Sequence, residues 1–219
     1  MLSAVLRLFF HHLYTTLAWT YDWVALSTSM GQWFEWQKAA LDALPKGRVL
    51  EVGIGTGHLM LEMEAIGLRP CGVDASKQMS NLAAKRLASH SADLRVVRAR
   101  AQALPFAGET FTGIVSTFPS EYIVQPATLR QIQRCLAPGG RAVIVPMARI
   151  TGDSWYDRLA DWLYRFTGQS GPIEQDWTKP FEPTGMLAHV EVVRQPRADV
   201  VRIVVDKPGV DDPLDGRLA

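Results

Sequence analysis

The sequence predicts an α/β fold, a doubly wound and mostly parallel sheet that ends in an antiparallel hairpin. From residue 48 to residue 146, short apolar runs alternate with amphipathic stretches, which is the pattern of parallel βαβ units. Near the C-terminus, two β-branched runs at 187–193 and 200–205 flank six residues that suit a hairpin connection. With 219 residues, 47% of them hydrophobic, the chain has the length of one domain.

Each element of the parallel part rests on a local signal, because a short apolar run predicts a strand and a 3.6-residue apolar period predicts a helix. Strands are expected at 48–52, 70–73, 94–97, 111–117 and 141–146, so that the hairpin completes a seven-stranded sheet. Helices are expected at 57–66, 77–89, 127–136 and 154–167. Pro138-Gly139-Gly140 is expected to separate the third helix from the fifth strand.

The stretch VLEVGIGTGH at 49–58 predicts a strand that runs into a glycine loop and then a helix. Gly53, Gly55 and Gly57 have no Cβ, so backbone N–H groups can approach a ligand closely there. Their G-x-G-x-G spacing differs from the G-x-G-x-x-G of dinucleotide-binding loops, which disfavours a pyrophosphate. A tight turn that binds nothing is the alternative.

Two carboxylates near the glycine loop indicate the chemical class of the expected ligand. Glu51 precedes the first glycine by two positions, where it would repel phosphate and attract an ammonium or sulfonium group. Asp74 ends the second expected strand, where it can accept both hydroxyls of a ribose. Together they predict a nucleoside with a cationic amino-acid tail. The alternatives are a helix N-terminal acid for Asp74 and a core-edge carboxylate for Glu51.

Residues 48–146 resemble the Rossmann-like class I S-adenosylmethionine-dependent methyltransferases. They are most similar to the small-molecule branch that includes quinone and sterol C-methyltransferases. The resemblance rests on five motifs in the family's order: LEVGIGTGHL, GVDASKQM, RAQALPF, FTGIVSTF and CLAPGGRAVIV. It implies an enzyme that uses S-adenosyl-L-methionine as its cofactor.

The resemblance also implies roles for residues. Glu51 and the three glycines would line the methionine end, Asp74 would hold the ribose, and 101–104 would edge the adenine ring. Thr117 and Phe118 would border the transferable methyl group. The implied cofactor-binding residues are Glu51, Gly53, Gly55, Gly57, Asp74, Ala75, Ala101, Gln102, Thr117 and Tyr21.

Two positions depart from the family pattern. Arg100 stands where an Asp often precedes the alanine of the third motif, so the adenine amine would be met by Gln102 or a backbone carbonyl. Thr112 stands where the fourth motif often has Asp. Neither change removes the glycine loop or the ribose carboxylate.

Methyl transfer from a sulfonium is an in-line displacement that depends mainly on positioning and on excluding water. A base is needed only if the acceptor carries a proton, and the candidates are Tyr21, Glu121 and Tyr122. The PSEY stretch at 119–122 departs at two positions from the Asn/Asp-Pro-Pro-aromatic motif of amide and base N-methyltransferases. Clustered carboxylates are missing after the fourth strand, so no metal is expected.

The acceptor is expected to be apolar. Of the 20 Phe, Trp and Tyr residues, nine lie in 9–36 and seven in 155–181, the segments that form the acceptor pocket in this family. Such a lid suits an aromatic or lipid-like small molecule, or an amine held by cation–π contact. Alternatively, these aromatics only pack helices on the sheet.

The expected organisation is an N-terminal helical lid at 1–46, a methyltransferase domain at 47–206 with a lid insertion at 151–185, and a flexible tail at 207–219. Residues 1–20 form an amphipathic pattern that packs on the domain, on a partner or on a membrane surface, and is too interrupted to span a membrane. Oligomeric state stays open.

Charge and cysteines indicate the location and partners. A net charge of +1 gives no reason to expect a nucleic-acid partner. Cys71 and Cys135 are far apart in sequence and are expected to be reduced and buried, in a cytoplasmic protein or one at the membrane surface. The alternative function is a non-catalytic S-adenosylmethionine-binding module, recruited to a partner or membrane by the first helix. A nicotinamide-dependent oxidoreductase is disfavoured by the glycine spacing.

Overall fold

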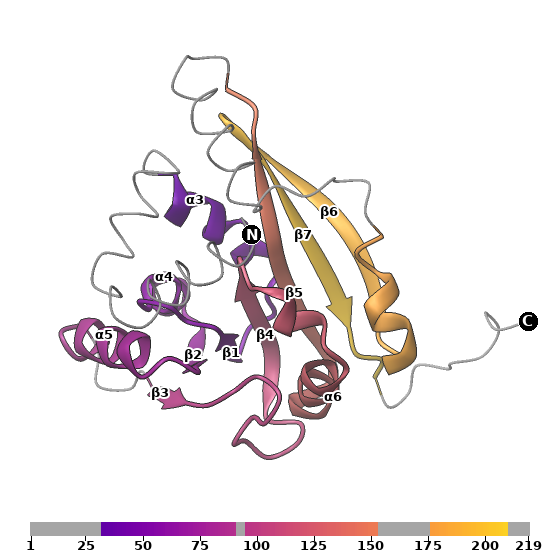
Figure 1. Cartoon of the computed structure of the whole chain (residues 1–219), viewed down its shortest axis with the longest axis horizontal. Helices are drawn as coiled ribbons and strands as arrows, with labels where there is room; N and C mark the ends of the chain where they lie inside the picture. Colours follow the sequence, from indigo (N-terminus) through magenta and orange to yellow (C-terminus); the bar gives the residue numbers. More distant parts are fainter. Residues whose placement is uncertain (1–31, 91–94, 153–175, 210–219) are drawn as a thin grey trace, which may run out of the picture.

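The computed structural model describes residues 32–90, 95–152 and 176–209. A seven-stranded sheet in the order β3-β2-β1-β4-β5-β7-β6 forms the centre of the molecule (Figure 1). The first five strands are parallel, and β7 runs antiparallel to both β5 and β6. The strands are β1 (Arg48–Val52), β2 (Arg69–Asp74), β3 (Arg95–Arg98), β4 (Phe111–Thr117), β5 (Leu136–Ile150), β6 (Leu187–Gln195) and β7 (Ala198–Asp206).

Helices cover both faces of the sheet. They are α3 (Trp33–Lys38), α4 (His58–Ala65), α5 (Lys77–Ala88) and α6 (Pro126–Cys135), with short 3₁₀ helices η2 (Leu41–Ala43), η3 (Glu121–Val124) and η4 (Lys179–Thr184). Successive strand residues point to opposite faces, so Val49 packs in the cluster of α3, α4 and α5. Its neighbour Leu50 packs in the cluster of α6 and η4.

The fold class predicted from the sequence is confirmed, and β1 and β4 have the predicted bounds. The predicted break at Pro138-Gly139-Gly140 is wrong, because these residues lie inside β5. Backbone bonds join Gly139 N to Lys207 O at 3.0 Å and Lys207 N to Gly140 O at 2.9 Å. Pairing with the end of β7 thus overrides the local signal of proline and glycine.

The hairpin is longer than the sequence predicts. Six residues were expected between its strands, but β6 and β7 leave only Pro196 and Arg197 in the turn. The extra residues are extended because they are paired, with Arg194 opposite Asp199 and Gln195 opposite Ala198. β5 also continues to Ile150, since its end pairs with the start of β7.

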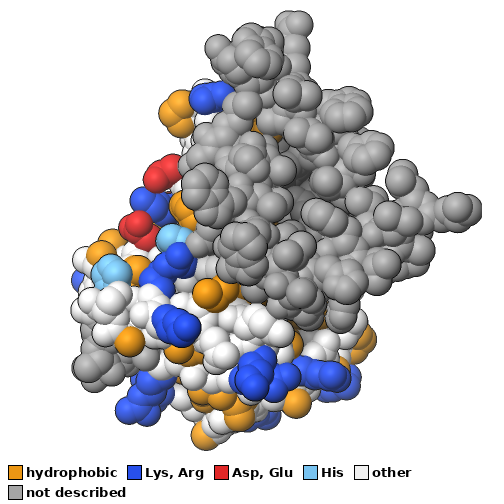
Figure 2. Space-filling view, turned by 60° about the vertical axis from the view of Figure 1, so that its left-hand side comes forward, with side chains coloured by type: hydrophobic (Ala, Val, Ile, Leu, Met, Phe, Trp, Pro, Cys, Tyr) orange, Lys and Arg blue, Asp and Glu red, His pale blue; other side chains and the backbone are white. Residues whose placement is uncertain are grey.

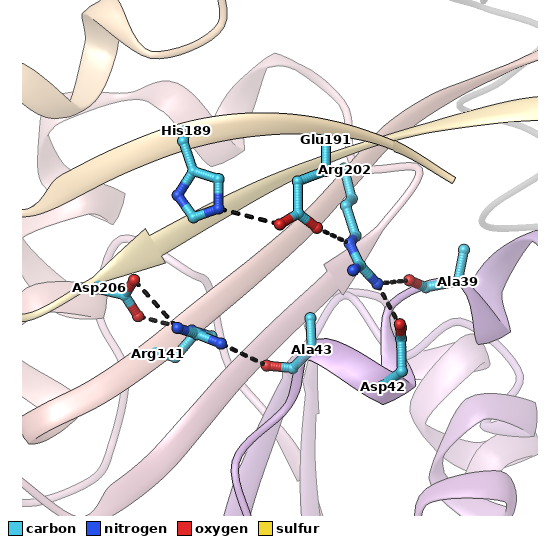
Figure 3. A network of polar contacts seen from close by, with 8 residues as sticks. All are labelled: Ala39, Asp42, Ala43, Arg141, His189, Glu191, Arg202 and Asp206. Atoms are coloured by element: carbon cyan, nitrogen blue, oxygen red, sulfur yellow. Dashed lines mark hydrogen bonds and ion pairs between the residues drawn. The ribbon is translucent and has the colours of Figure 1, made fainter. Parts of the chain in front are cut away.

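A polar network fastens the η2 segment to the antiparallel strands (Figure 3). Arg202 of β7 donates to Ala39 O at 2.8 Å and to Glu191 Oε2 at 2.6 Å, and it also bonds the Asp42 carboxylate. Arg141 of β5 donates to Asp206 at 2.7 and 3.3 Å. These bonds hold the stretch that follows α3 on the sheet.

Several expectations fall outside the described residues: the amphipathic pattern of 1–20, the helix at 154–167 and most of the tail. Lys207, where the tail was expected to begin, is anchored by its Nζ to Gln133 O at 3.1 Å and to Leu136 O at 2.7 Å. Cys71 and Cys135 are free and buried, as predicted. None of the helices in the described ranges has the length and hydropathy that a membrane span requires.

Candidate functional site

The glycine loop connects the carboxyl end of β1 to α4. Gly53, Gly55 and Gly57 all have positive φ, at 80°, 54° and 81°, which residues with a Cβ rarely adopt. The β2 strand supports the turn, because Gly53 N and Ile54 N both donate to Val73 O, at 2.8 and 3.2 Å. The loop therefore has a backbone shape that depends on glycine.

The surroundings of the three glycines differ. A Cβ on Gly57 would lie 3.1 Å from Ala83 Cβ, so this glycine lets α5 pack closely. A Cβ on Gly53 would lie 2.4 Å from the hydroxyl of Tyr122, which therefore sits directly over the first glycine. A Cβ on Gly55 would meet nothing within 4 Å. The loop is thus packed on one side, covered by Tyr122 at its start and open at its centre.

Asp74 joins the loop to the next helix. Its Oδ2 accepts from Gly55 N at 3.0 Å, and its Oδ1 accepts from Ser76 N at 2.8 Å. Burial raises the pKa of this carboxyl, and the two backbone bonds act in the opposite direction. The N-cap of α5 is Ser76, whose Oγ accepts from Met79 N. Asp74 is therefore bound to the glycine loop rather than capping the helix with its own side chain.

Glu51 lies on β1 beneath the loop and is 1% exposed. Burial, with a smaller effect from the charge of Asp74, raises the pKa of Glu51 well above its ordinary value. No hydrogen-bond partner reaches its Oε2 from the part of the chain that the structure describes. A buried carboxyl oxygen without a partner costs free energy, and a cationic or hydrogen-bonding ligand group would recover it.

The segment after β3 begins beside Asp74, because Ala99 N donates to Asp74 O at 3.1 Å. Ala101 is buried within it, and Gln102 Nε2 donates to Gln125 Oε1 at 2.8 Å. Ala75 is exposed, and its carbonyl accepts from Arg98 at 3.3 Å. The predicted adenine-side residues therefore follow the ends of β2 and β3, with the Gln102 amide already bonded to another side chain.

The end of β4 carries an unusual backbone. Thr117 is buried, and Phe118 has φ 48°, which is uncommon for a residue other than glycine and frequent at functional sites. Phe118 N donates to Val145 O at 2.7 Å, which helps to hold this conformation. Its ring stacks on Trp33 of α3 at 4.2 Å between centroids.

The α3 helix lies over two strand ends at once. Besides the contact of Trp33 with Phe118, the ring of Phe34 lies 4.0 Å from that of His58, which follows the last glycine of the loop. The sequence signal for this arrangement was the aromatic enrichment at 9–36. That signal includes Trp33 and Phe34 but does not predict their contacts with Phe118 and His58, because these pairs form between distant segments.

The predicted catalytic candidates separate in the structure. Tyr122 is half-buried in η3 with its hydroxyl at the loop, whereas Glu121 is exposed at the start of the same helix. Tyr21 lies outside the described residues. Within 32–90, 95–152 and 176–209, no three His, Cys, Asp or Glu side chains form a group that could hold a metal ion.

Comparisons with known proteins agree with this geometry. Residues 49–140 match a family model described as a methyltransferase domain. The chain is 30% identical over 142 residues to the ubiquinone/menaquinone biosynthesis C-methyltransferase of Geotalea daltonii, a match that covers 61% of the chain and 60% of that protein. It is 31% identical over 139 residues to the demethylmenaquinone methyltransferase of Thermus thermophilus, covering 61% of the chain and 63% of that protein. The chain thus spans about three fifths of the length of these curated relatives.

Solved structures share the fold. A methyltransferase from Thermotoga maritima superposes with a TM-score of 0.62 at 19% identity, over 90% of this chain and 98% of that one. Phosphoethanolamine N-methyltransferase 2 of Haemonchus contortus gives a TM-score of 0.61 at 16% identity, over 81% of this chain and 53% of that one. The family match over residues 49–140, these relatives and the common fold all show similarity to S-adenosylmethionine-dependent methyltransferases.

Proposed function

We propose that this protein is a methyltransferase that binds S-adenosyl-L-methionine at the glycine loop and transfers its methyl group to a hydrophobic small molecule. The observation that carries the proposal is the pair of buried carboxyls at the loop. Glu51 has an unpartnered oxygen, and the carboxylate of Asp74 accepts only from backbone N–H groups among the described residues. Two acids without a cation favour a ligand that brings hydroxyls and a positive charge.

The residues present fit this cofactor. Glu51 and the glycine loop would hold the methionine end, with the open side of Gly55 giving room for close approach. Asp74 would accept the ribose hydroxyls through the lone pairs that its backbone bonds leave free. Ala75, Ala101 and Gln102 would border adenine, and Thr117 the methyl group. When bound, the cofactor supplies an electrophilic methyl group on a sulfonium.

The chain's own residues would position the acceptor and exclude water. The Tyr122 hydroxyl lies over Gly53, at the end of the loop assigned to the methionine part, where it can orient an acceptor or take its proton. Trp33 and Phe34 bring aromatic surface over the ends of β4 and the loop. Such a wall excludes water and favours a flat, apolar acceptor. Tyr21, outside the described residues, is proposed to close over the same site.

The names of the relatives support a choice of acceptor class. Two of them are named for ubiquinone or menaquinone biosynthesis and for demethylmenaquinone, which supports a quinone-like aromatic acceptor here. A cytoplasmic location, with residues 1–20 contacting the membrane surface, would suit an acceptor of this kind. We also keep the division into a lid at 1–46, a domain at 47–206 with an insertion at 151–185, and a tail from 207.

The test is transfer of a deuterated methyl group from labelled S-adenosylmethionine to demethylmenaquinone, followed by mass spectrometry. We expect labelled product from the wild-type chain, none from Asp74→Ala, and slower turnover with unchanged cofactor affinity from Tyr122→Phe. Cofactor binding without transfer to this or any other quinone precursor would favour the non-catalytic binding module. Absence of cofactor binding would contradict the proposal altogether.

A further inference from the structure

The two edge strands of the sheet differ in how they are protected against pairing with another strand. Free edge strands expose unpaired backbone groups, and proteins usually protect them with short length, charged side chains or proline. β3 forms one edge; it has four residues and exposes Arg95 and Arg98. Lys and Arg side chains are also spread along the lower part of the face in Figure 2. The β3 edge is thus protected in the usual way.

The β6 edge is longer and less protected, and its charged residues are Glu191 and Arg194. It is nine residues long, LAHVEVVRQ, with neither lysine nor proline. It exposes Leu187, Val190 and Val192 by 63, 38 and 45% of their surfaces. β6 is the last strand in the order of the sheet, so no strand of the described ranges pairs with its outer side. A long apolar edge of this kind is a template for another strand.

The backbone groups available on that edge follow from the hairpin. Gln195 and Ala198 flank the two-residue turn and are the closing pair of the ladder. In an antiparallel ladder, hydrogen-bonded and non-bonded pairs alternate, so the odd-numbered residues of β6 bond to β7. The N–H and C=O groups of Ala188, Val190 and Val192 then point outward.

We propose that β6 pairs antiparallel with β6 of a second copy of this chain, about a two-fold axis through Val190. An axis perpendicular to the sheet keeps each side chain on its own face and makes the contact isologous. Val190 then lies opposite Val190 of the partner subunit, and Ala188 opposite Val192 of the partner subunit. On the other face, Glu191 lies opposite His189 of the partner subunit. Every apolar residue meets an apolar one, and the acid meets an imidazole.

Neighbouring registers match poorly. An axis through Glu191 places two carboxylates directly opposite, which is destabilising. An axis through Val192 places Glu191 opposite a valine and Val190 opposite an arginine. An axis through His189 places Leu187 opposite Glu191. The pattern of side chains along β6 therefore selects the axis through Val190.

The charged face of the ladder is already organised for this contact. His189 Nε2 lies 3.1 Å from Glu191 Oε1, and Arg202 bonds the other oxygen of Glu191 (Figure 3). His189 and Glu191 keep 53 and 38% of their side-chain surface exposed at the edge. Across the axis, each Glu191 would gain a second imidazole without losing Arg202.

Cysteine cross-linking tests the register. Residues of a hydrogen-bonded antiparallel pair have Cα atoms about 5.5 Å apart, within disulfide reach. Under a mild oxidant, Val190→Cys is expected to form a covalent dimer, whereas Val192→Cys is not, because Val192 faces Ala188 of the partner subunit. The wild-type chain is the control, since Cys71 and Cys135 are buried. Equal or stronger cross-linking of Val192→Cys, or none at Val190→Cys, would overturn the register.

Sedimentation over a concentration series tests the interface without cysteines. The wild-type chain is expected to approach twice its mass of 24.3 kDa as concentration rises. Val190→Lys should remain at the monomer mass because the two lysines would face each other. Ile66→Lys, at another exposed apolar residue, which directly follows helix α4, should behave as wild type. A wild-type chain that stays monomeric at every concentration, or a dimer unaffected by Val190→Lys, would contradict the proposal.

Discussion

The acidic residues in the two halves of the sheet have pKa values shifted in opposite directions. In the parallel half, burial raises the pKa values of both Glu51 and Asp74. In the antiparallel half, Arg202 holds the pKa of Glu191 below its usual value, chiefly through their hydrogen bond. Asp206 is likewise bonded by Arg141. Acids that have arginine partners stabilise the fold, whereas acids without a cationic partner are available to bind a ligand.

This contrast assigns the acids of the loop to ligand binding and the acids of β6 and β7 to the stability of the fold. The arginines that pair with the acids of β6 and β7 also donate to Ala39 O and Ala43 O, so these pairs fasten the segment after α3 (Figure 3). The acids of the loop make only backbone bonds in the described part of the chain, and Glu51 leaves an oxygen unpaired. Substitutions in the two halves should therefore affect different measurements.

The largest effect is expected from Asp74→Ala, which removes the bonds to Gly55 N and Ser76 N as well as the proposed ribose contact. Affinity for S-adenosylhomocysteine should fall about 100-fold, since charge-assisted hydrogen bonds contribute about 1.5–3 kcal/mol each. Isothermal titration calorimetry measures this loss. Ser76→Ala is the matched control, because it keeps the N–H that Asp74 bonds while it removes the hydroxyl that caps the helix and bonds Gln78. Equal losses in both variants would refute the role of Asp74.

Arg202→Ala should act mainly on stability. The Arg202 side chain is 12% exposed and donates to Ala39 O, Glu191 and Asp42. Its removal should lower the free energy of unfolding by about 2 kcal/mol, with far less effect on cofactor affinity than Asp74→Ala. Chemical denaturation measures the first quantity.

Lys38→Ala is the control for Arg202→Ala, since its ion pairs with Glu35 and Glu62 are more exposed. That variant should lose no more than about 0.5 kcal/mol. If Arg202→Ala weakened cofactor binding as much as Asp74→Ala does, the two halves would not be functionally separate.

A smaller effect on stability is expected from Glu51→Gln, and its sign depends on whether the ligand is bound. Because the folded pKa of Glu51 is raised, its contribution to stability is present below its unfolded value near 4.5 and is lost as pH rises through the folded value. Without ligand, Glu51→Gln should therefore unfold with a weaker dependence on pH and be more stable at the alkaline end. Asp74 retains part of the dependence, since its pKa is also raised.

With S-adenosylmethionine present, the order should reverse, and Glu51→Gln should bind about tenfold more weakly, or about 1.4 kcal/mol. Thermal denaturation across pH, with and without cofactor, measures both signs. A Glu51→Gln variant that is less stable than wild type without ligand at alkaline pH would contradict the assignment of Glu51 as an unpaired buried acid.

Local patterns predicted the parallel half of the molecule well. The bounds of β1 and β4 follow from apolar runs that are buried on both faces. The extent of β5, β6 and β7 did not, because their terminal residues are extended only through pairing with one another. Local sequence patterns depend only on residues that are close in sequence, so they do not predict pairing between strands that are distant in sequence.

The candidate site shows the same limit. The glycines were identified from their spacing after the first strand, Glu51 from its position two residues before them, and Asp74 because it ends the second strand. The approach of the Tyr122 hydroxyl to Gly53 depends on where η3 packs, and the contact of Trp33 with Phe118 depends on where α3 packs. Both are tertiary contacts between distant segments, and the sequence of neither segment predicts the contact.

The central claim is that the unpaired acids of the glycine loop take a cationic nucleoside. It is tested most directly by titrating the protein with S-adenosylmethionine in buffers of different ionisation enthalpy, at a pH above 4.5 and below the raised pKa of Glu51. We predict one site per chain and release of protons on binding, because the positive ligand lowers that pKa. Glu51→Gln should release fewer protons. No binding, or proton release that is the same in Glu51→Gln, would contradict the account.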